Sequence, residues 1–156
     1  MSEQGAVHEL LQSRIGSEIH TSEWLEITQE RVNTFAEATS DHQWIHVDVE
    51  RARRESPWGG PIAHGYLTLS LYPMLRGLVS AETPVYPGVR NVINYGLNKL
   101  RFPAAVGVGN RVRARCTLLG VEEVKGGLQI TEQYTVEIEG EEKPACVAEA
   151  IMRLYF

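Results

Sequence analysis

The chain has 156 residues, 43% of them hydrophobic and 22% charged, and its formal net charge is −5. These values fit one folded domain over 1–156, exclude a largely disordered chain, and exclude a broad nucleic-acid-binding surface, which needs clustered Lys and Arg. No apolar run approaches the ~20 residues that cross a bilayer, and acidic Glu3 and Glu9 stand where a secretory leader would carry basic residues. We therefore expect a cytoplasmic protein without a membrane segment.

Three elements are predicted before residue 41. A short amphipathic helix covers 7–14 and ends at Gly16. Residues 24–27 form a short strand, and Thr28 then caps a second helix that stops near Ser40. Residues at helical spacing form one side of each helix: Val7, Leu10 and Leu11 in the first, and Val32, Phe35, Ala36 and Thr39 in the second.

The next segment, 41–61, is predicted to be an irregular loop with one turn of helix around 49–53, and loops of this composition often carry function. A strongly apolar helix over 63–80 follows. It has few charges on any face and should therefore be buried, while Pro73 should bend it or remove one hydrogen bond. The loop is interrupted by Pro57, Gly59, Gly60 and Pro61, and the apolar helix residues are Leu67, Leu71, Met74, Leu75 and Leu78.

The C-terminal half alternates apolar and polar residues with a period of 2, which is typical of strands. Gly126-Gly127 separates two of these runs and predicts a hairpin turn. The fold class is therefore α+β, with an antiparallel sheet that wraps around the apolar helix. The strands are expected over 92–102, 111–118, 128–138 and 146–154.

The segment 40–48 holds two histidines and two carboxylates directly after a predicted helix end. A carboxylate and an imidazole that lie close together can activate one water molecule, because one holds or takes a proton while the other delivers it. Asp41 and His46 are therefore the candidate catalytic pair. The alternative is that these are ordinary loop residues and that Asp41 caps a turn.

A metal site is a second alternative for this segment. His42 and His46 are four residues apart, and Asp41 or Asp48 could complete a set of two histidines and one carboxylate. No helical pattern supports that geometry and no HExxH motif is present, so we expect no metal and no other cofactor. The two cysteines lack CxxC spacing and are expected to be buried free thiols: Cys116 and Cys146.

The segment 60–66 is the second candidate for chemistry. Gly65 lets a ligand approach the backbone closely, and the free N–H groups at a helix start attract developing negative charge, so an oxyanion site is available there. The alternative is that Gly60 and Gly65 serve packing and turn formation, while His64 is a structural histidine with its hydrogen bonds satisfied.

Together these residues resemble the MaoC-like dehydratase family, which includes the (R)-specific enoyl-CoA hydratases and the nodulation protein N group. The similarity runs from about Trp24 to the C-terminus, and the role of residues 1–20 is open. The family's D-x(4)-H motif, followed by an aspartate, is matched by Asp41, His46 and Asp48. Its P-I-x-H-G motif at the start of the central helix is matched by Pro61-Ile62-Ala63-His64-Gly65.

A third segment is similar to the family pattern L-x-F-x-x-P-V-x-x-G-D, with Ala105 and Asn110 in place of the usual proline and aspartate. The hydratases commonly have Asn-Pro inside the first motif, where this chain has Gln43-Trp44, closer to the nodulation protein N group. This difference bears on substrate range more than on reaction type. The positions that keep the third pattern are Leu100, Phe102, Val106 and Gly109.

The resemblance implies a hot-dog fold, in which an antiparallel sheet wraps a long central helix and two copies pair as a homodimer. It implies hydration of a trans-2-enoyl-CoA to the (R)-3-hydroxyacyl-CoA, or the reverse dehydration, in fatty acid metabolism, with acyl carrier protein as an alternative carrier. Asp41 and His46 would be catalytic, the Gly65 N–H would meet the thioester oxygen, and Gln43 would help to orient the pair.

Two other functions are weighed against this one. A hot-dog acyl-CoA thioesterase would use a carboxylate to hydrolyse the thioester without touching the alkene, and a non-catalytic acyl-binding subunit would support a partner. The spacing of Asp41 and His46, followed by the His-Gly motif, favours the hydratase. Trp44 and Trp58 are expected in the core, with a place in the acyl pocket as the alternative.

Overall fold

The computed structural model describes residues 1–80 and 82–156. Within these ranges no helix is both long enough and apolar enough to cross a bilayer. The helices are α1 Glu3–Arg14, α2 Gln29–Thr39, α3 Trp44–Val47, α4 Val49–Glu55, α5 Gly65–Ser70 and α6 Tyr72–Arg76. The strands are β1 Glu18–Thr21, β2 Leu25–Glu26, β3 Asn91–Arg101, β4 Arg111–Val124, β5 Gly127–Ile138 and β6 Cys146–Tyr155.

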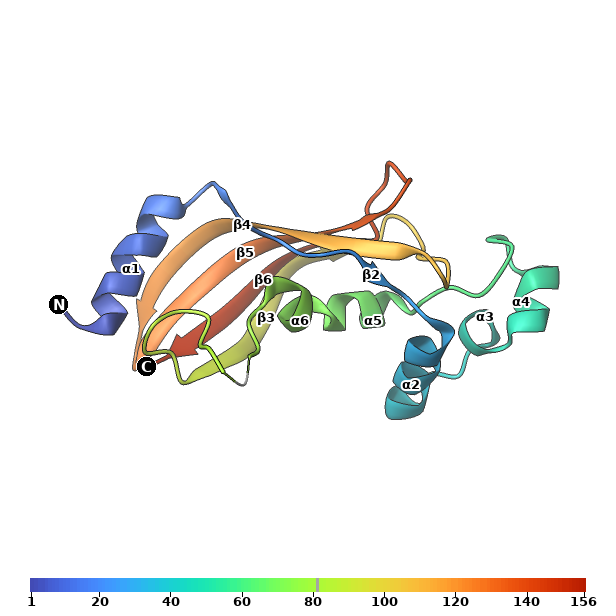
Figure 1. The fold of residues 1–156 in the computed structure, drawn as a ribbon, viewed down its shortest axis with the longest axis horizontal. Helices are drawn as coiled ribbons and strands as arrows, with labels where there is room; N and C mark the ends of the chain where they lie inside the picture. The colour runs from blue at the N-terminus through green and yellow to red at the C-terminus, as the bar shows by residue number, and fades with distance from the viewer. Residues whose placement is uncertain (81) are drawn as a thin grey trace.

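One antiparallel sheet organises the fold. Its strand order is β1-β4-β5-β6-β3, and β2 adds to β4 beside β1. Figure 1 shows α5 and α6 against the concave face of the curved sheet, with α1 at one end of the sheet and α2 to α4 beyond the other end. This arrangement confirms the predicted α+β class and the sheet that wraps around the apolar helical segment.

The N-terminal helix starts earlier than predicted. Ser2 caps α1 by accepting a hydrogen bond from the Gly5 N–H, and Val7 and Leu11 are buried where α1 packs against β4. Leu10 is 48% exposed, so its predicted place on the packed side is wrong. Residues 1–20, which had no sequence-based role, thus cover one end of the sheet and also supply the short strand β1.

The central helix is not continuous. It was predicted over 63–80, but the structure divides it into α5 and α6 at Leu71. Pro73 lies in the first turn of α6, where its missing N–H costs no helical hydrogen bond, so the break accommodates the proline. Leu67 and Leu75 are buried as expected, whereas Met74 is 47% exposed.

The sheet supplies the apolar core through side chains of β4, β5 and β6 that alternate between buried and accessible positions. The β4–β5 hairpin turns one residue earlier than predicted, because Gly127 already pairs with Val124 and leaves Lys125 and Gly126 as the turn. Gly126 has φ +83°, a left-handed conformation that glycine adopts without strain.

A charged cluster interrupts the apolar face of β5. Glu132 is fully buried there, and its carboxylate accepts bonds from Arg76 Nε at 2.9 and 3.0 Å and from Nη2 at 2.9 Å. The Tyr72 hydroxyl also donates to Glu132, and burial next to this carboxylate raises the pKa of Tyr72. The cluster therefore ties α6 to the sheet through bonds that fix its orientation.

The remaining structural expectations have mixed outcomes. Cys116 and Cys146 are buried free thiols as predicted, and burial raises the pKa of each to about 12. The core placement of the tryptophans is wrong: Trp58 is 51% exposed, and Trp44 is partly exposed beneath the Arg51 guanidinium, 4.2 Å from its ring. Such a planar cation stacks on an aromatic face without being buried.

Candidate active site

The first motif lies where α2 ends and the chain turns back toward the sheet. Ser40 takes a left-handed conformation with φ 61° and ends α2. The chain then forms the single turn α3, and Asp48 caps α4 by accepting a hydrogen bond from the Arg51 N–H at 3.1 Å. Asp41 thus lies before α3 and His46 within it, so one short loop carries both candidate groups.

The ring of His46 is buried and held by a hydrogen bond. The side chain is 6% exposed, and its Nδ1 lies 2.6 Å from the carbonyl oxygen of Ile62. A carbonyl oxygen only accepts hydrogen bonds, so Nδ1 carries the proton and Nε2 keeps a lone pair. The imidazole is therefore set in the tautomer that can take a proton at Nε2.

The surroundings of His46 favour its neutral form. Burial lowers the pKa of His46 below its ordinary value of 6.5, the Ile62 carbonyl acts in the opposite direction, and His64 lowers it further. The net direction is downward, which keeps the ring unprotonated near neutral pH. A neutral imidazole with a free Nε2 has the protonation state of a general base.

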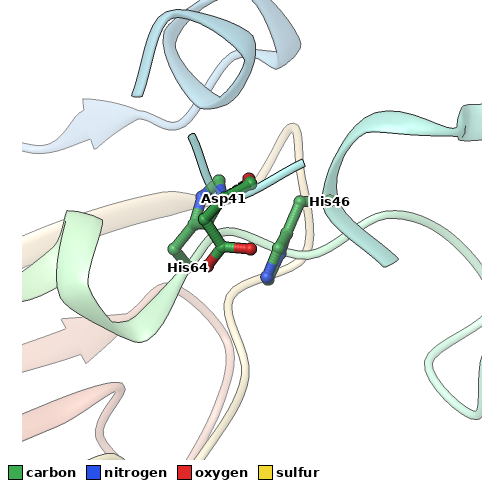
Figure 2. Close-up of side chains that lie close together, drawn as sticks. All are labelled: Asp41, His46 and His64. Atoms are coloured by element: carbon green, nitrogen blue, oxygen red, sulfur yellow. Dashed lines mark hydrogen bonds between the residues drawn. The ribbon is translucent and has the colours of Figure 1, made fainter. Parts of the chain in front are cut away.

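Asp41 meets His46 from the accessible side. Asp41 is exposed, and the potential ligand atoms of Asp41, His46 and His64 all lie within 4.8 Å of one another. Figure 2 shows the Asp41 carboxylate and the His46 ring next to each other. Two polar atoms at this separation can share one water molecule, since each hydrogen bond spans about 2.8 Å. The two groups therefore lie close enough to share a water molecule, and their catalytic role stays a prediction.

His64 joins this pair from the second motif. Its ring is 3% exposed and stacks on the His46 ring with the centroids 3.8 Å apart and the planes 25° apart. Its Nε2 lies 3.0 Å from the Asp41 carbonyl oxygen and therefore donates to it. Its buried Nδ1 finds no partner among the residues that the structure describes. The expectation of a histidine with all its bonds satisfied is thus only half right.

Gly65 begins α5 directly after His64. A Cβ at this position would lie 2.9 Å from Cδ2 of Phe102, closer than real Cβ atoms approach other carbons. The aromatic residue of the third motif therefore needs a glycine opposite it. The Gly65 N–H belongs to the first turn of a helix, where backbone donors have no partner inside the helix.

The second and third motifs lie side by side. The Ala63 N–H donates to the Val106 carbonyl at 2.8 Å, and Ile62 forms an isolated antiparallel bridge with Gly107. The Ile62 N–H also bonds to the Ile45 carbonyl at 3.0 Å. These backbone bonds fasten the loop that carries His46 to the start of the central helix.

The other predicted residues have smaller parts. Gln43 is exposed, and its backbone N–H approaches Asp41 Oδ1 at 3.4 Å, so its contact with the pair comes from the backbone. His42 bonds to Glu37 at 2.7 Å and lies away from the cluster of Asp41, His46 and His64, which contradicts a metal site built on His42 and His46.

Sequence reasoning missed one group at this site, Gln29, and one contact, that of His64 with His46. Gln29 of α2 donates from Nε2 to the His46 carbonyl at 2.8 Å, and no sequence pattern marks it. His64 was noted but given no contact with the pair. Its place in the second motif was the available signal, but the stacking on His46 joins residues 18 positions apart and depends on the tertiary fold.

An open groove lies along the helical segment beyond Gly65. It has a volume of about 420 Å³ and runs between α5, α6 and β3. The rings of Tyr66 and Phe102 meet edge to face and are accessible, with Tyr66 66% and Phe102 38% exposed. The groove is lined in part by Leu69, Tyr72, Tyr95 and Leu97. It can accept an extended apolar chain, and its lining begins at Leu69, four residues beyond Gly65.

The model of the family described as "MaoC like domain" matches residues 11–140. The 3-hydroxyacyl-thioester dehydratase Z of Mycobacterium tuberculosis is 54% identical over 144 residues, which cover 92% of each chain. Nodulation protein N of Rhizobium leguminosarum bv. viciae is 43% identical over 155 residues, covering 96% of this chain and 94% of that protein.

The fold is also found among solved structures. The (R)-hydratase from A. caviae involved in PHA biosynthesis superposes with a TM-score of 0.69 at 26% identity, covering 90% of this chain and 96% of that one. A monoamine oxidase regulatory protein from Archaeoglobus fulgius gives a TM-score of 0.73 at 22% identity over 91% of each chain, a likeness of fold.

Proposed function

Since this chain belongs to the MaoC-like dehydratase family, we propose that it is a hydro-lyase that interconverts a trans-2-enoyl thioester and the (R)-3-hydroxyacyl thioester. The observation that carries the proposal is the approach of Asp41 and His46 to within water-bridging distance, with Nε2 of His46 free to take a proton. The names of the related dehydratase and (R)-hydratase agree with this reaction and with a role in fatty acid metabolism.

In the hydration direction one water molecule lies between Asp41 and His46. Nε2 of His46 takes a proton from the water as its oxygen forms a bond with the β-carbon, and the Asp41 carboxylate accepts the other hydrogen in a hydrogen bond that orients the water. The proton taken up by His46 then passes to the α-carbon. Hydroxyl and hydrogen are thereby added across the double bond, and both side chains return to their starting states.

Negative charge develops on the thioester oxygen when the β-carbon is attacked. The Gly65 N–H at the start of α5 donates a hydrogen bond to that oxygen. A backbone donor needs no reorganisation during the reaction, and a donor of this kind is worth ~2.7–4 kcal/mol in other enzymes. Because Gly65 has no side chain, the thioester can approach its backbone closely.

The acyl chain extends from this point along the groove between α5, α6 and β3. The groove is mostly apolar and holds about 420 Å³, which suits the fatty part of an acyl thioester. Coenzyme A is the carrier that we propose first, and acyl carrier protein is the alternative, because both present the acyl group as the same thioester of phosphopantetheine.

We also propose that the working form is a homodimer. β3 lies at one edge of the sheet, and its side chains Ile93, Tyr95 and Leu97 are 50%, 54% and 40% exposed. An exposed edge with apolar side chains favours pairing with a second copy. Light scattering of purified protein should give twice the mass of the chain, and Ile93→Lys should lower it toward one chain, whereas a monomeric wild type would contradict this part.

The compartment follows from the chemistry of the thiols and the substrate. Cys116 and Cys146 are unpaired and buried, as is usual for proteins of reducing compartments. Acyl thioesters of coenzyme A are intracellular metabolites. We therefore place the proposed activity in the cytoplasm.

The experiment uses purified wild-type protein and the variants Asp41→Asn and His46→Gln, assayed with crotonyl-CoA at the enoyl thioester absorbance. Each variant should lose roughly 10²–10⁴-fold in kcat, because each removes one proton-handling group. His42→Gln is the matched control, since His42 lies in the same loop but bonds to Glu37. Wild-type turnover in either site variant would refute the role of that residue.

The same assay separates the competing functions. A hydratase consumes the enoyl absorbance without releasing free coenzyme A thiol, whereas a thioesterase releases the thiol. A non-catalytic subunit does neither over a series of enoyl chain lengths. Either of the last two outcomes would overturn the proposed function.

A further inference from the structure

We infer that His64 is a positioning residue that holds Asp41 and His46 at their working separation. The inference rests on the proposed function and goes beyond it, because His64 takes no part in the proton transfers described above. It is carried by two contacts of one buried ring: stacking on His46 at 3.8 Å, and a hydrogen bond from Nε2 to the Asp41 carbonyl at 3.0 Å.

Asp41 needs an anchor of this kind. It is exposed, it follows the left-handed residue that ends α2, and among residues 1–80 and 82–156 its carboxylate accepts only from the distant N–H of Gln43, at 3.4 Å. The hydrogen bond from His64 to its carbonyl is the shorter of these two contacts and comes from a buried ring. Loss of that bond would leave the backbone of Asp41 free to move relative to His46.

The ring of His64 also limits where the ring of His46 can lie. The Ile62 carbonyl fixes the Nδ1 edge of His46, and the stacked His64 ring covers one of its faces. Phe35 of α2 packs against His64 with the ring centroids 4.9 Å apart. His64 therefore packs between α2 and the loop that carries Asp41 and His46. Because His64 directly precedes α5, its contacts fix both catalytic groups relative to the start of that helix.

Two other roles for His64 fit the geometry less well. A direct proton-transfer role fits less well, because Nε2 donates to a backbone carbonyl and the other ring nitrogen, Nδ1, is itself buried. A shared metal site with His46 conflicts with the stacking, because the lone pairs of stacked rings lie in two nearly parallel planes, whereas the lone pairs of two ligands of one ion must converge on it.

His64 covers one face of His46 and donates a hydrogen bond through Nε2, while its buried Nδ1 has no hydrogen-bond partner in the described part of the chain. The titratable groups that face His46 are Asp41 from its own loop and His64 from the start of α5, while α2 contributes the neutral amide of Gln29. Removal of the His64 ring would therefore expose His46 to water and raise its pKa.

The experiment separates the two contacts of His64. His64→Phe keeps a stacked ring but removes the N–H, and His64→Gln keeps an N–H donor but removes the ring. His20→Phe is the matched control, because His20 is a partly buried histidine whose Nε2 bonds to the Leu75 carbonyl at 2.8 Å, away from the site. For each protein we would measure kcat with crotonyl-CoA, the pH dependence of kcat/KM, the thermal unfolding midpoint and the His46 ring pKa by NMR.

Both His64 variants should remain folded and lose roughly 10- to 100-fold in kcat, the usual result of misplacing a catalytic group by about 1 Å. His64→Gln should also raise the pKa of His46 and move the acidic limb of kcat/KM to higher pH, whereas His64→Phe should leave the limb in place. His20→Phe should change neither kcat nor the limb.

The inference fails if kcat of both His64 variants stays within twofold of wild type, or if the His46 pKa is the same in His64→Gln as in wild type. The NMR titration needs no turnover, so it tests the positioning role even if crotonyl-CoA is not hydrated. If the wild type is inactive but His64→Gln still raises the His46 pKa, the proposed function is overturned and the positioning role of His64 is not.

Discussion

Gly65→Ala tests the close fit between the second and third motifs. The new Cβ would lie 2.9 Å from Cδ2 and 3.0 Å from Cε2 and Cγ of Phe102. Carbon atoms in good contact are ~3.5 Å apart or more, so the Phe102 ring or the start of α5 must move by about half an ångström. Overpacking of this kind costs ~1–3 kcal/mol, and Phe102, which is 38% exposed, can yield in part.

The sign of the stability change is informative. Without the clash, alanine in place of glycine in a helix would stabilise the protein by ~0.5–1 kcal/mol. We expect instead a loss of about 1 kcal/mol in the free energy of unfolding measured with urea. We also expect kcat with crotonyl-CoA to fall by about tenfold, because the Gly65 N–H and His64 move with the start of α5.

The matched control is Gly120→Ala, because a Cβ at Gly120 meets nothing within 4 Å. The double variant Gly65→Ala/Phe102→Ala removes the ring that the new Cβ would strike. In the Phe102→Ala background, Gly65→Ala should therefore cost less stability than it does in wild type, and a cycle of the four proteins measures the difference. A Gly65→Ala protein as stable and active as wild type, or a loss unchanged by Phe102→Ala, would refute the reasoning.

Two further predictions concern buried ionisable groups. Glu132→Ala should lower the free energy of unfolding in urea by ~3–5 kcal/mol, because it leaves the Arg76 guanidinium buried without its carboxylate. The double variant Arg76→Met/Glu132→Leu should recover most of this loss, and equal losses in the two proteins would contradict the explanation. Since the pKa of folded His46 lies below 6.5, the acidic limb of the wild-type kcat/KM profile should lie below pH 6.5, and a limb above that pH would exclude His46 as the base. The free energy of unfolding should also decrease as the pH drops below 6.5, because the unfolded chain then binds more protons than the folded one.

The strands were the most predictable part of the fold. Alternation with a period of 2 reports directly which side of a strand faces the core, and three of the four predicted C-terminal strands match β3, β5 and β6 within one residue at each end. The fourth was predicted to end at Leu118, whereas β4 continues to Val124. The central helix was less predictable, because apolar composition shows that a segment is buried but not where Pro73 divides it. Trp58 shows the same limit: its size predicted burial, whereas the fold leaves it half exposed.

Glu132 illustrates why part of the packing could not be predicted. It occupies a core-facing position of β5, and its partner Arg76 lies 56 residues away on α6. Sequence alternation alone gives no reason to pair the two. Only the sheet register and the placement of α6 bring them together, and the same holds for Gln29 and the His46 carbonyl.

The amino-acid sequence by itself determined the fold class, the four C-terminal strands, and the loop that carries Asp41 and His46, because hydrophobic period and motif spacing are local properties of the chain. The tertiary structure decided which atoms of these residues face one another. It set the tautomer of His46 through the Ile62 carbonyl, and it stacked His64 on His46. These contacts join segments that only the folded sheet and helices bring within hydrogen-bond distance.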